Sequence, residues 1–471
     1  MLSGDNGILQ RATDAKTKSD EAQIKERIQL AYHSALTKDI TGESGELTMP
    51  TLQEALNNEF TGKTVTITPS VDNKEWIIKV DEVEETVPAG KDTTPQVATL
   101  PSRDGTNPYL PSSSFSQLDG TDLSTGLVIT DEVNEDGNSI GNEYVWIEVP
   151  RTASTYGNSF NLNYDFDNMT EEQKNTAYSA IATALRSYVS DIITETDGSE
   201  VSRNNKTTTV GFSDTWYLGC GIADSSAYIT LYNKMLKSIY ENGGFWIGRY
   251  EAGMTGDTGR VDENVSIDGV IPLSKPNLIP IFYVTCNQAQ TISTRVENKG
   301  IYNSSLMFGI QWDLVLKHLK NKGISPNLLT EDSSSWGNYS NTTNATLTGG
   351  KYTQYMNSSY QPAFNKNWYA YNVDLGEIVK NNVFNNVGMP LSVLLTTGSS
   401  NKFSQKNIFD LAGNLFEWTL ETDSVSEYSN HTVGRGGSYY SGTGSNCPVS
   451  FRNNGNSTFS NEYYGFRVSI Y

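Results

Sequence analysis

The stretch "NIFDLAGNLFEWT" (Asn407–Thr419) decides the fold of this chain, together with two short segments that follow it. These are "RGGS" from Arg435 to Ser438 and "GFR" from Gly465 to Arg467. The paired glycines after Arg435 let the backbone approach a neighbouring element closely, and Trp418 supplies a large apolar anchor. The three segments therefore predict a firm C-terminal core that holds both ends of the residues between them.

The enclosed stretch, 438–464, contains six Ser, five Asn and four Tyr but only two charges, Arg452 and Glu462. Tyr offers contact area with few rotatable bonds, and Ser, Gly and Asn offer adaptable hydrogen bonds. The composition indicates a loop that contacts a ligand, although a passive, Asn-rich surface loop is the alternative. The candidate contact residues are Tyr439, Tyr440, Ser441, Asn446, Asn453, Asn454, Asn456, Phe459, Asn461, Tyr463 and Tyr464.

The three segments, in this order, resemble the formylglycine-generating-enzyme-like, or sulfatase-modifying-factor, family, whose fold is a variant of the C-type lectin fold. Three upstream segments resemble other parts of that family: "GFWIGRYEAG" (244–253), "PIFYVTCNQAQTISTRV" (280–296) and "SLMFGIQWDLVLKHL" (305–319). The resemblance implies a large α+β domain over residues 98–471.

A structural calcium ion is also implied by this resemblance. In the family, the positions that match Asp410 and Glu417 ligate calcium together with the backbone carbonyls at Gly413 and Leu415. Carboxylates and carbonyls around a sharp turn are hard oxygen ligands of the kind that calcium requires. The alternative is that these carboxylates only cap a turn and form salt bridges.

The chain departs from the catalytic members of the family at the cysteines. Those members use two cysteines between the "RGGS" and "GFR" segments as a copper-binding redox pair, whereas only Cys447 lies in that interval here. Since one soft ligand does not make a two-thiolate site, we expect no copper, no catalytic residues and no enzymatic activity. The three histidines, His33, His318 and His431, are isolated, so no zinc or serine-hydrolase motif is present.

The C-terminal stretch also resembles the variable region of diversity-generating-retroelement target proteins. In those proteins, a segment between "RGGS" and "GFR" is altered at adenines of its codons. This resemblance implies that residues 438–464 are the variable part of the protein. It further predicts a near-identical template copy of the coding segment for residues 434–471, beside a reverse transcriptase gene.

The first part of the chain predicts an amphipathic helix over residues 3–38, with an apolar stripe that includes Ile28, Ala31 and Ala35. The sequence of this region, "MLSGDNGILQRATDAKTKSDEAQIKERIQLAY", resembles the region just after the membrane segment of type IV pilins and pseudopilins. Residues 73–87, "NKEWIIKVDEVEETV", resemble a pilin-type strand and turn. The resemblance implies a pilin-like helix over 1–40 that contacts other pilins, a small β region over 41–97, and a preceding membrane segment that is missing here.

Several further elements are predicted from local pattern. We expect strands over 126–131 and 142–150, helices over 169–192, 225–244 and 304–323, a linker over 85–115 and a surface insertion over 331–362. Thr170 and Gln173 form a capping box for the first of these helices, and Gly243 provides a stop for the second.

Composition excludes some classes of function. The formal charge of −20, from 54 acidic and 34 basic residues, repels phosphate backbones and argues against nucleic-acid binding. No window of 18 apolar residues is present, so we expect the membrane to be reached only through the missing N-terminal segment. Three cysteines are too few for a disulfide framework, and the pairing of a single bridge stays open.

The functional hypothesis is therefore a ligand-binding protein, an adhesin or receptor displayed outside the cell on a bacterial surface or a type IV pilus. Its ligand would be a protein or a glycan. Two alternatives remain: an oxidase of the formylglycine-generating type, and a purely structural minor pilin.

Overall fold

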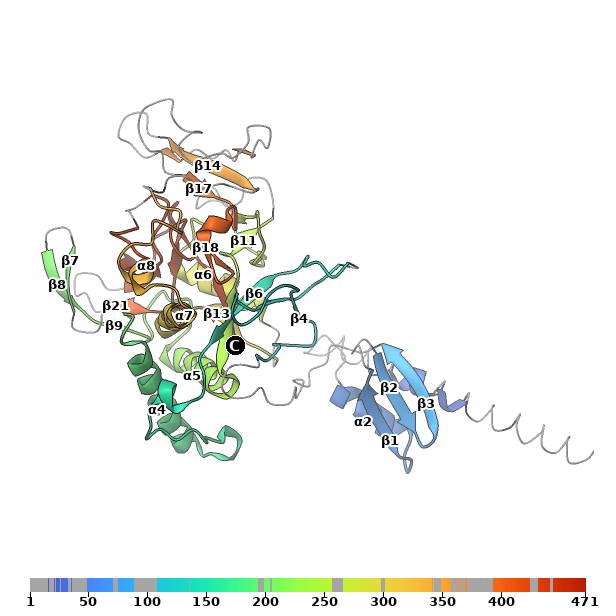
Figure 1. Ribbon diagram of the computed structural model, residues 1–471. Coiled ribbons are helices and arrows are strands. Elements are labelled where there is room, and N and C mark those ends of the chain that lie inside the picture. The colour runs from blue at the N-terminus through green and yellow to red at the C-terminus, as the bar shows by residue number, and fades with distance from the viewer. Residues whose placement is uncertain are drawn as a thin grey trace, which may run out of the picture. The chain divides into compact units, whose positions relative to one another are not determined.

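The computed structural model describes most of the chain, in two units: Met1–Val97 and Ala98–Tyr471 (Figure 1). The described residues are 16, 21, 23–25, 27–32, 35, 49–70, 75–88, 108–134, 136–193, 199–203, 206–255, 266–297, 301–340, 342, 349–356, 363–364, 369–370, 393–423, 431–440 and 444–471. Each unit is considered by itself.

The first unit packs helices against a small antiparallel sheet. The sheet has the order β1 (Val65–Pro69), β2 (Glu75–Val80) and β3 (Val83–Pro88), and α2 spans Met49–Glu59. Described residues between 16 and 35 are also helical. The predicted apolar stripe is confirmed at Ile28, Ala31 and Ala35, which are buried, whereas the remainder of 3–38 lies mostly outside the described residues. The unit's core consists of Ile28, Ala31, Tyr32, Ala35, Leu52, Leu56, Phe60, Trp76, Ile78, Val80 and Val87.

The second unit is built on a six-stranded sheet with the order β13-β25-β10-β6-β5-β4. These strands are β4 (Ser116–Gln117), β5 (Val128–Thr130), β6 (Glu143–Glu148), β10 (Gly244–Gly248), β13 (Ser304–Leu306) and β25 (Val468–Ile470). The last strand of the chain lies between β13 and β10 and pairs antiparallel with both. The strands predicted at 126–131 and 142–150 are confirmed as β5 and β6.

Both faces of this sheet are buried. Successive side chains of a strand point to opposite faces, and on β6 Val145 and Ile147 join the main core while Tyr144 and Trp146 join a second cluster with Trp246. All four of these β6 side chains are buried because the sheet is covered on both sides.

Helices cover the face that carries Val145 and Ile147. They are α3 (Ala153–Tyr156), α4 (Glu171–Val189), α5 (Ser225–Asn242), α6 (Cys286–Ser293), α7 (Gly309–Asn321) and α8 (Pro326–Thr330), with 3₁₀ turns at Phe166–Asn168, Thr294–Val296 and Asn401–Phe403. The capping box of α4 is confirmed, since Thr170 and Gln173 bond reciprocally. Gly243 ends α5 in the left-handed conformation, as predicted.

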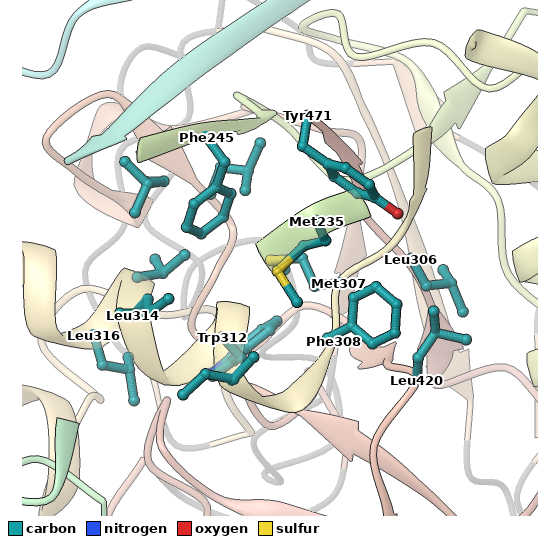
Figure 2. Packing of buried hydrophobic residues seen from close by; sticks show 14 of the residues in the cluster. Met235, Phe245, Leu306, Met307, Phe308, Trp312, Leu314, Leu316, Leu420 and Tyr471 are labelled. Carbon is teal, nitrogen blue, oxygen red and sulfur yellow. The ribbon is translucent and has the colours of Figure 1, made fainter. Parts of the chain in front are cut away.

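Figure 2 shows where these helices meet the sheet. Met235 of α5, Phe245 of β10 and Trp312 of α7 point toward one another, with Tyr471, the last residue, at the edge of the same cluster. Burying an aromatic or aliphatic side chain of this size contributes roughly 1.5–3 kcal/mol relative to exposure. The C-terminus is thus part of the core of the unit.

A smaller four-stranded sheet, in the order β23-β22-β20-β24, carries the C-terminal segments. Its strands are β20 (Phe416–Trp418), β22 (His431–Arg435), β23 (Arg452–Asn456) and β24 (Tyr464–Gly465). Short pairs complete the unit: β7 (Ser199–Arg203) with β8 (Lys206–Val210), β9 (Phe212–Ser213) with β21 (Thr422–Asp423), β11 (Gly253–Met254) with β12 (Ile279–Pro280), and β18 (Ser404–Gln405) with β19 (Ile408–Phe409). β14 (Lys351–Met356) pairs with β15 (Ala363–Phe364), β16 (Tyr369–Ala370) and β17 (Val393–Leu395).

Two sequence-based expectations are corrected. The helix predicted from residue 304 begins only at Gly309, because residues 304–306 form β13 against β25. The stretch predicted as a surface insertion from residue 331 is in part core: Trp336, Asn338 and Tyr339 are buried, and the Tyr339 hydroxyl donates to the Gly436 carbonyl at 3.0 Å. The low-complexity composition of this stretch gave no indication that these aromatic residues would be buried.

Among the helices of the described residues, none is both long enough and apolar enough to cross a bilayer.

Candidate functional site

The C-terminal segment leaves β22 through two glycines that no other residue could replace without strain. Gly436 has φ 91° and Gly437 has φ 81°, values that L-residues rarely adopt. A Cβ atom on Gly436 would lie 2.6 Å from the Leu411 carbonyl oxygen, and one on Gly437 would lie 2.5 Å from the Tyr339 ring. The "RGGS" segment is therefore a sharp turn fitted tightly against the core.

The segment ends at a second fixed point, Arg467, whose side chain is completely buried. Its guanidinium donates to Glu417 Oε1 at 2.7 Å, to the Phe409 carbonyl at 2.7 Å and to the Gly248 carbonyl at 2.8 Å. Arg467 thereby joins the end of the segment to β20 and β10. The predicted firm anchoring of both ends is confirmed.

A third anchor lies inside the segment and was not predicted. Arg452 and Arg435 together bind two buried carboxylates: Arg452 donates to Asp313 Oδ2 at 2.6 Å and to Glu421 Oε1 at 2.9 Å, and Arg435 donates to the other oxygens of both. Burial alone would raise the pKa of Asp313, but the charges of Arg452 and Arg435 hold that pKa below its usual value. The four side chains form a neutral, buried network.

Residues next to Arg452 are held equally firmly. The Trp312 indole donates to the Val449 carbonyl at 3.0 Å, the Val449 amide donates to Ser333 Oγ at 2.9 Å, and the Ser450 amide donates to the Leu329 carbonyl at 3.1 Å. Residues 449–452 therefore belong to the core. They divide the segment into an entry arm, 438–446, and an exit arm, 453–463.

The two arms meet through an aromatic pair. The rings of Tyr440 and Tyr463 stack with centroids 5.9 Å apart and planes 23° apart. Tyr440 is 37% exposed, and Phe459, in the exit arm, is 52% exposed. Tyr440 and Phe459 therefore lie at the surface.

Two predicted contacts are corrected. Tyr439 is buried, and Tyr464 is buried against Trp418 with ring centroids 3.9 Å apart and nearly parallel planes. Their rings form part of the floor beneath the arms, so they are not ligand contacts on this surface. The sequence of the segment has no helical or alternating period, so it could not show that Tyr439 and Tyr464 are buried while Tyr440 and Tyr463 are not.

The predicted asparagines are mostly half-buried, and several shape the exit arm. Asn453 donates to the Tyr464 hydroxyl at 2.6 Å, Asn456 Oδ1 accepts the Thr458 amide at 3.0 Å, and Asn461 Oδ1 accepts the Tyr463 amide at 3.3 Å. Asn454 is half-buried and Asn446 is exposed. Ser441 lies outside the described residues.

Two residues outside the segment flank the exit arm and were not predicted. Tyr283 adopts φ 56°, which is unusual for a bulky residue, and its amide donates to the Asn461 carbonyl at 3.1 Å. Leu218 is 64% exposed, and its carbonyl accepts the Ser457 hydroxyl at 3.3 Å. Gly219, with φ 95°, lets this turn approach Ser457. The closely spaced glycines at 219 and 221 indicated a tight turn, but they did not indicate that this turn contacts Ser457 of the exit arm.

The predicted calcium ligands, Asp410, Gly413, Leu415 and Glu417, lie together but do not fit a calcium ion. Both oxygens of Glu417 accept hydrogen bonds from Arg467, so this carboxylate already faces a cation. Asp410 Oδ2 accepts the Gly398 amide at 2.6 Å. Over the described residues, no group of three or more His, Cys, Asp or Glu side chains is placed to hold a metal.

A third buried carboxyl, Glu251, lies beside this pair and was missed. Its oxygens accept the Asn414 side-chain amide at 2.6 Å and the Leu415 amide at 3.1 Å. Burial first, and then the neighbouring carboxyls, raise the pKa of Glu251 well above its usual value, and burial raises the pKa of Asp410 to about 7. The raised pKa values favour the neutral forms of these two carboxyls.

The three cysteines, all of which are described, are free thiols. Cys286 is buried, with its sulfur 3.1 Å from the Tyr217 hydroxyl, and burial raises its pKa to about 11. Cys220 is also buried, whereas Cys447, which directly follows the entry arm, is half-buried. The thiol form of Cys286 is therefore the stable one, which disfavours metal binding there.

Comparison with known families gives one match. Residues 395–470 match the family described as "Sulfatase-modifying factor enzyme 1-like domain". The matched range contains all three C-terminal segments that carried the predicted resemblance, which is confirmed for that range. No curated protein matches the chain.

Proposed function

We propose that the unit formed by residues 98–471 is a ligand-binding domain and that the two arms of residues 438–463 form its binding surface. The observation that carries the proposal is the internal anchor at Arg452. Because residues 449–452 are fixed in the core, the arms on either side can present Tyr440, Tyr463 and Phe459 without destabilising the fold. Exposed aromatic side chains on a rigid support are typical of recognition surfaces.

The surroundings of the arms support a protein ligand in preference to a glycan. Leu218, whose carbonyl contacts Ser457, and Phe459, two residues after Ser457, are exposed apolar side chains. The segment itself carries Glu462 as its only charge besides the buried Arg452. Interface centres are depleted in charge and enriched in aromatic residues. Leu218 and Phe459 therefore add apolar area of the kind that a protein partner would bury.

Display on a bacterial surface or a type IV pilus is part of the same proposal. The first unit supports it by its arrangement: the amphipathic helix residues Ile28, Ala31 and Ala35 share a core with a three-stranded antiparallel sheet. A helix laid on a small sheet would serve as a stalk for the larger unit. Diversification by a retroelement would act on the arms, where substitutions cost least.

An experiment on the full chain tests the binding function. Purified extracellular glycoproteins, including mucin, are immobilised before and after enzymatic deglycosylation, and retention of the chain is compared with that of Tyr440→Ala/Phe459→Ala. We expect at least one preparation to retain the wild-type chain irrespective of deglycosylation, and to retain the double variant at least about a hundredfold less tightly. Equal retention of both chains would contradict the proposed surface, and loss on deglycosylation would identify a glycan ligand.

The formylglycine-generating reaction is the second candidate because of the family match at residues 395–470. It requires oxidation of a substrate cysteine, with dioxygen as the oxidant. Incubation of the chain with copper and a cysteine-containing sulfatase peptide would reveal it as an aldehyde in the peptide. We expect no aldehyde, since Cys447 is the only cysteine between "RGGS" and "GFR".

A further inference from the structure

A pocket distant in sequence from the C-terminal arms lies between α3, the last turn of α4 and α7. It has a volume of about 340 Å³, within the range of small-molecule sites. Its lining comprises Ser154, Thr155, Tyr156, Gly157, Ala184, Ser187, Tyr188, Ser190, Asp191 and Lys317. Six of these ten residues carry a hydroxyl group, which is an unusual concentration of groups that both donate and accept hydrogen bonds.

The two charged residues of the lining, Asp191 and Lys317, form an ion pair. Asp191 Oδ1 lies 2.7 Å from Lys317 Nζ, and its other oxygen lies 2.7 Å from Lys320 Nζ. Although partial burial opposes it, hydrogen bonds and charge from both lysines lower the pKa of Asp191, so it is a carboxylate at neutral pH. Each carboxylate oxygen keeps a further lone pair that can accept a hydrogen bond. A charged ligand would have to compete with this pairing, whereas a neutral ligand would not.

Several polar groups of the lining retain hydrogen-bonding capacity. The Tyr156 side chain contributes to the lining, but its hydroxyl is closed off from solvent. Ser187 is exposed at the mouth. Ser190 Oγ donates to the Ser187 carbonyl at 2.7 Å and can still accept.

The walls of the pocket are fixed. Asn321 donates to the Tyr188 hydroxyl at 2.7 Å, and Lys317 Nζ lies 4.7 Å from the centroid of the Tyr188 ring. Gly157, with φ 95°, ends α3 directly at the lining. The pocket therefore does not need to be organised by its ligand, which reduces the entropic cost of binding.

We infer that this pocket binds a neutral polyhydroxyl ligand of the size of one sugar ring. Such a ligand carries several hydroxyl groups that match the donors and acceptors of the lining, and it carries no charge that would disturb the Asp191–Lys317 pair. This inference is independent of the binding surface on the C-terminal arms.

The test uses the full chain and saturation-transfer NMR with D-glucose, D-galactose, D-mannose, N-acetyl-D-glucosamine and myo-inositol as probes. Acetate and methylammonium, which carry carbon-bound protons, serve as charged probes. We expect transfer to at least one neutral probe, with a dissociation constant of about 1 mM or below, and none to the charged probes. Transfer to none of the neutral probes, or to the charged probes alone, would overturn the inference.

Two variants locate the binding. Ser187→Phe fills the mouth of the pocket from an exposed helical position and should abolish transfer, whereas Ser179→Phe, an exposed serine of the same helix outside the lining, should leave transfer unchanged. Unchanged transfer in Ser187→Phe would show that the probes bind elsewhere and would overturn the assignment.

Discussion

The guanidinium of Arg452 lies 2.6 Å from a carboxylate oxygen of Asp313, although 139 positions separate the two residues in the chain. This contact joins the middle of a polar C-terminal segment to helix α7, which packs against the central sheet. The segment is therefore not one long loop but two arms that flank a fixed centre. Residues 449–452 therefore belong to the core, although they lie inside the interval 438–464 that was predicted to be variable.

The first prediction concerns this anchor. Arg452→Ala leaves Asp313 and Glu421 buried with one guanidinium fewer, and breaking a buried ion pair costs about 3–5 kcal/mol of stability. Urea unfolding of the full chain measures this loss. The neighbouring Asn454→Ala, on the half-buried face of the same strand, should cost less than about 1 kcal/mol. Equal losses in the two variants would contradict the role of Arg452 as an anchor.

A second prediction separates tyrosines that look alike in the sequence. Tyr464→Ala removes a buried ring stacked on Trp418 and should destabilise the unit by about 3–5 kcal/mol. Tyr440→Ala removes an exposed ring and should change stability by no more than about 0.5 kcal/mol. Thermal unfolding followed by near-ultraviolet circular dichroism distinguishes the two. The reverse order of stabilities would place Tyr440, rather than Tyr464, in the core.

A third prediction follows from His318, which is buried in α7 and accepts the Glu148 amide at Nδ1. Burial lowers the pKa of His318 to about 3 from an ordinary value of 6.5. Between these values the unfolded chain binds one proton more than the folded chain. Stability is therefore fully present above pH 6.5 and decreases as the pH falls, by up to about 1.4 kcal/mol per pH unit from this group.

The matched variant is His318→Gln, whose amide oxygen can also accept a hydrogen bond. The free energy of unfolding is measured in urea at about pH 7 and about pH 5. Other groups that titrate in this range affect both proteins alike. The difference between the two proteins in how the free energy of unfolding changes with pH therefore reports on His318 alone. Identical slopes would mean that His318 is protonated in the folded chain.

A fourth prediction addresses calcium. Because Glu417 faces Arg467, we expect neither calcium chloride nor a chelator to shift the midpoint of thermal unfolding. A ligand at 100 times its dissociation constant would stabilise the folded chain by about 2.7 kcal/mol, which such a measurement detects readily. A calcium-dependent rise that disappears in Asp410→Asn would restore the calcium site.

The sequence predicted the parts of this fold that depend on local chemistry. The capping box at Thr170 and the stop at Gly243 follow from the hydrogen bonds and backbone angles of a few neighbouring residues. The ends of the C-terminal segment were likewise visible in the glycines after Arg435 and in the position of Arg467. The family match at residues 395–470 covers these features.

Long-range partners could not be read in this way. Nothing near Arg452 indicates Asp313 as its partner, and nothing near Leu218 or Tyr283 places them beside the exit arm. The segment has no helical or alternating period, so burial of Tyr439 and Tyr464 could not be separated from exposure of Tyr440. The pairing of Glu417 with Arg467 argues against the predicted calcium site. This pairing could not be read from the local sequence because Arg467 lies 50 positions beyond Glu417.

The central claim, that exposed aromatic side chains on fixed arms bind a ligand, is tested most directly by titration calorimetry with a protein retained in the panel experiment. The full chain and Tyr440→Ala/Phe459→Ala are titrated in parallel, and their free energies of unfolding are measured on the same preparations. The account predicts an affinity at least about a hundredfold lower for the double variant, that is, about 2.7 kcal/mol, with stability unchanged. Unchanged affinity, or a loss of affinity matched by a loss of stability, would contradict it.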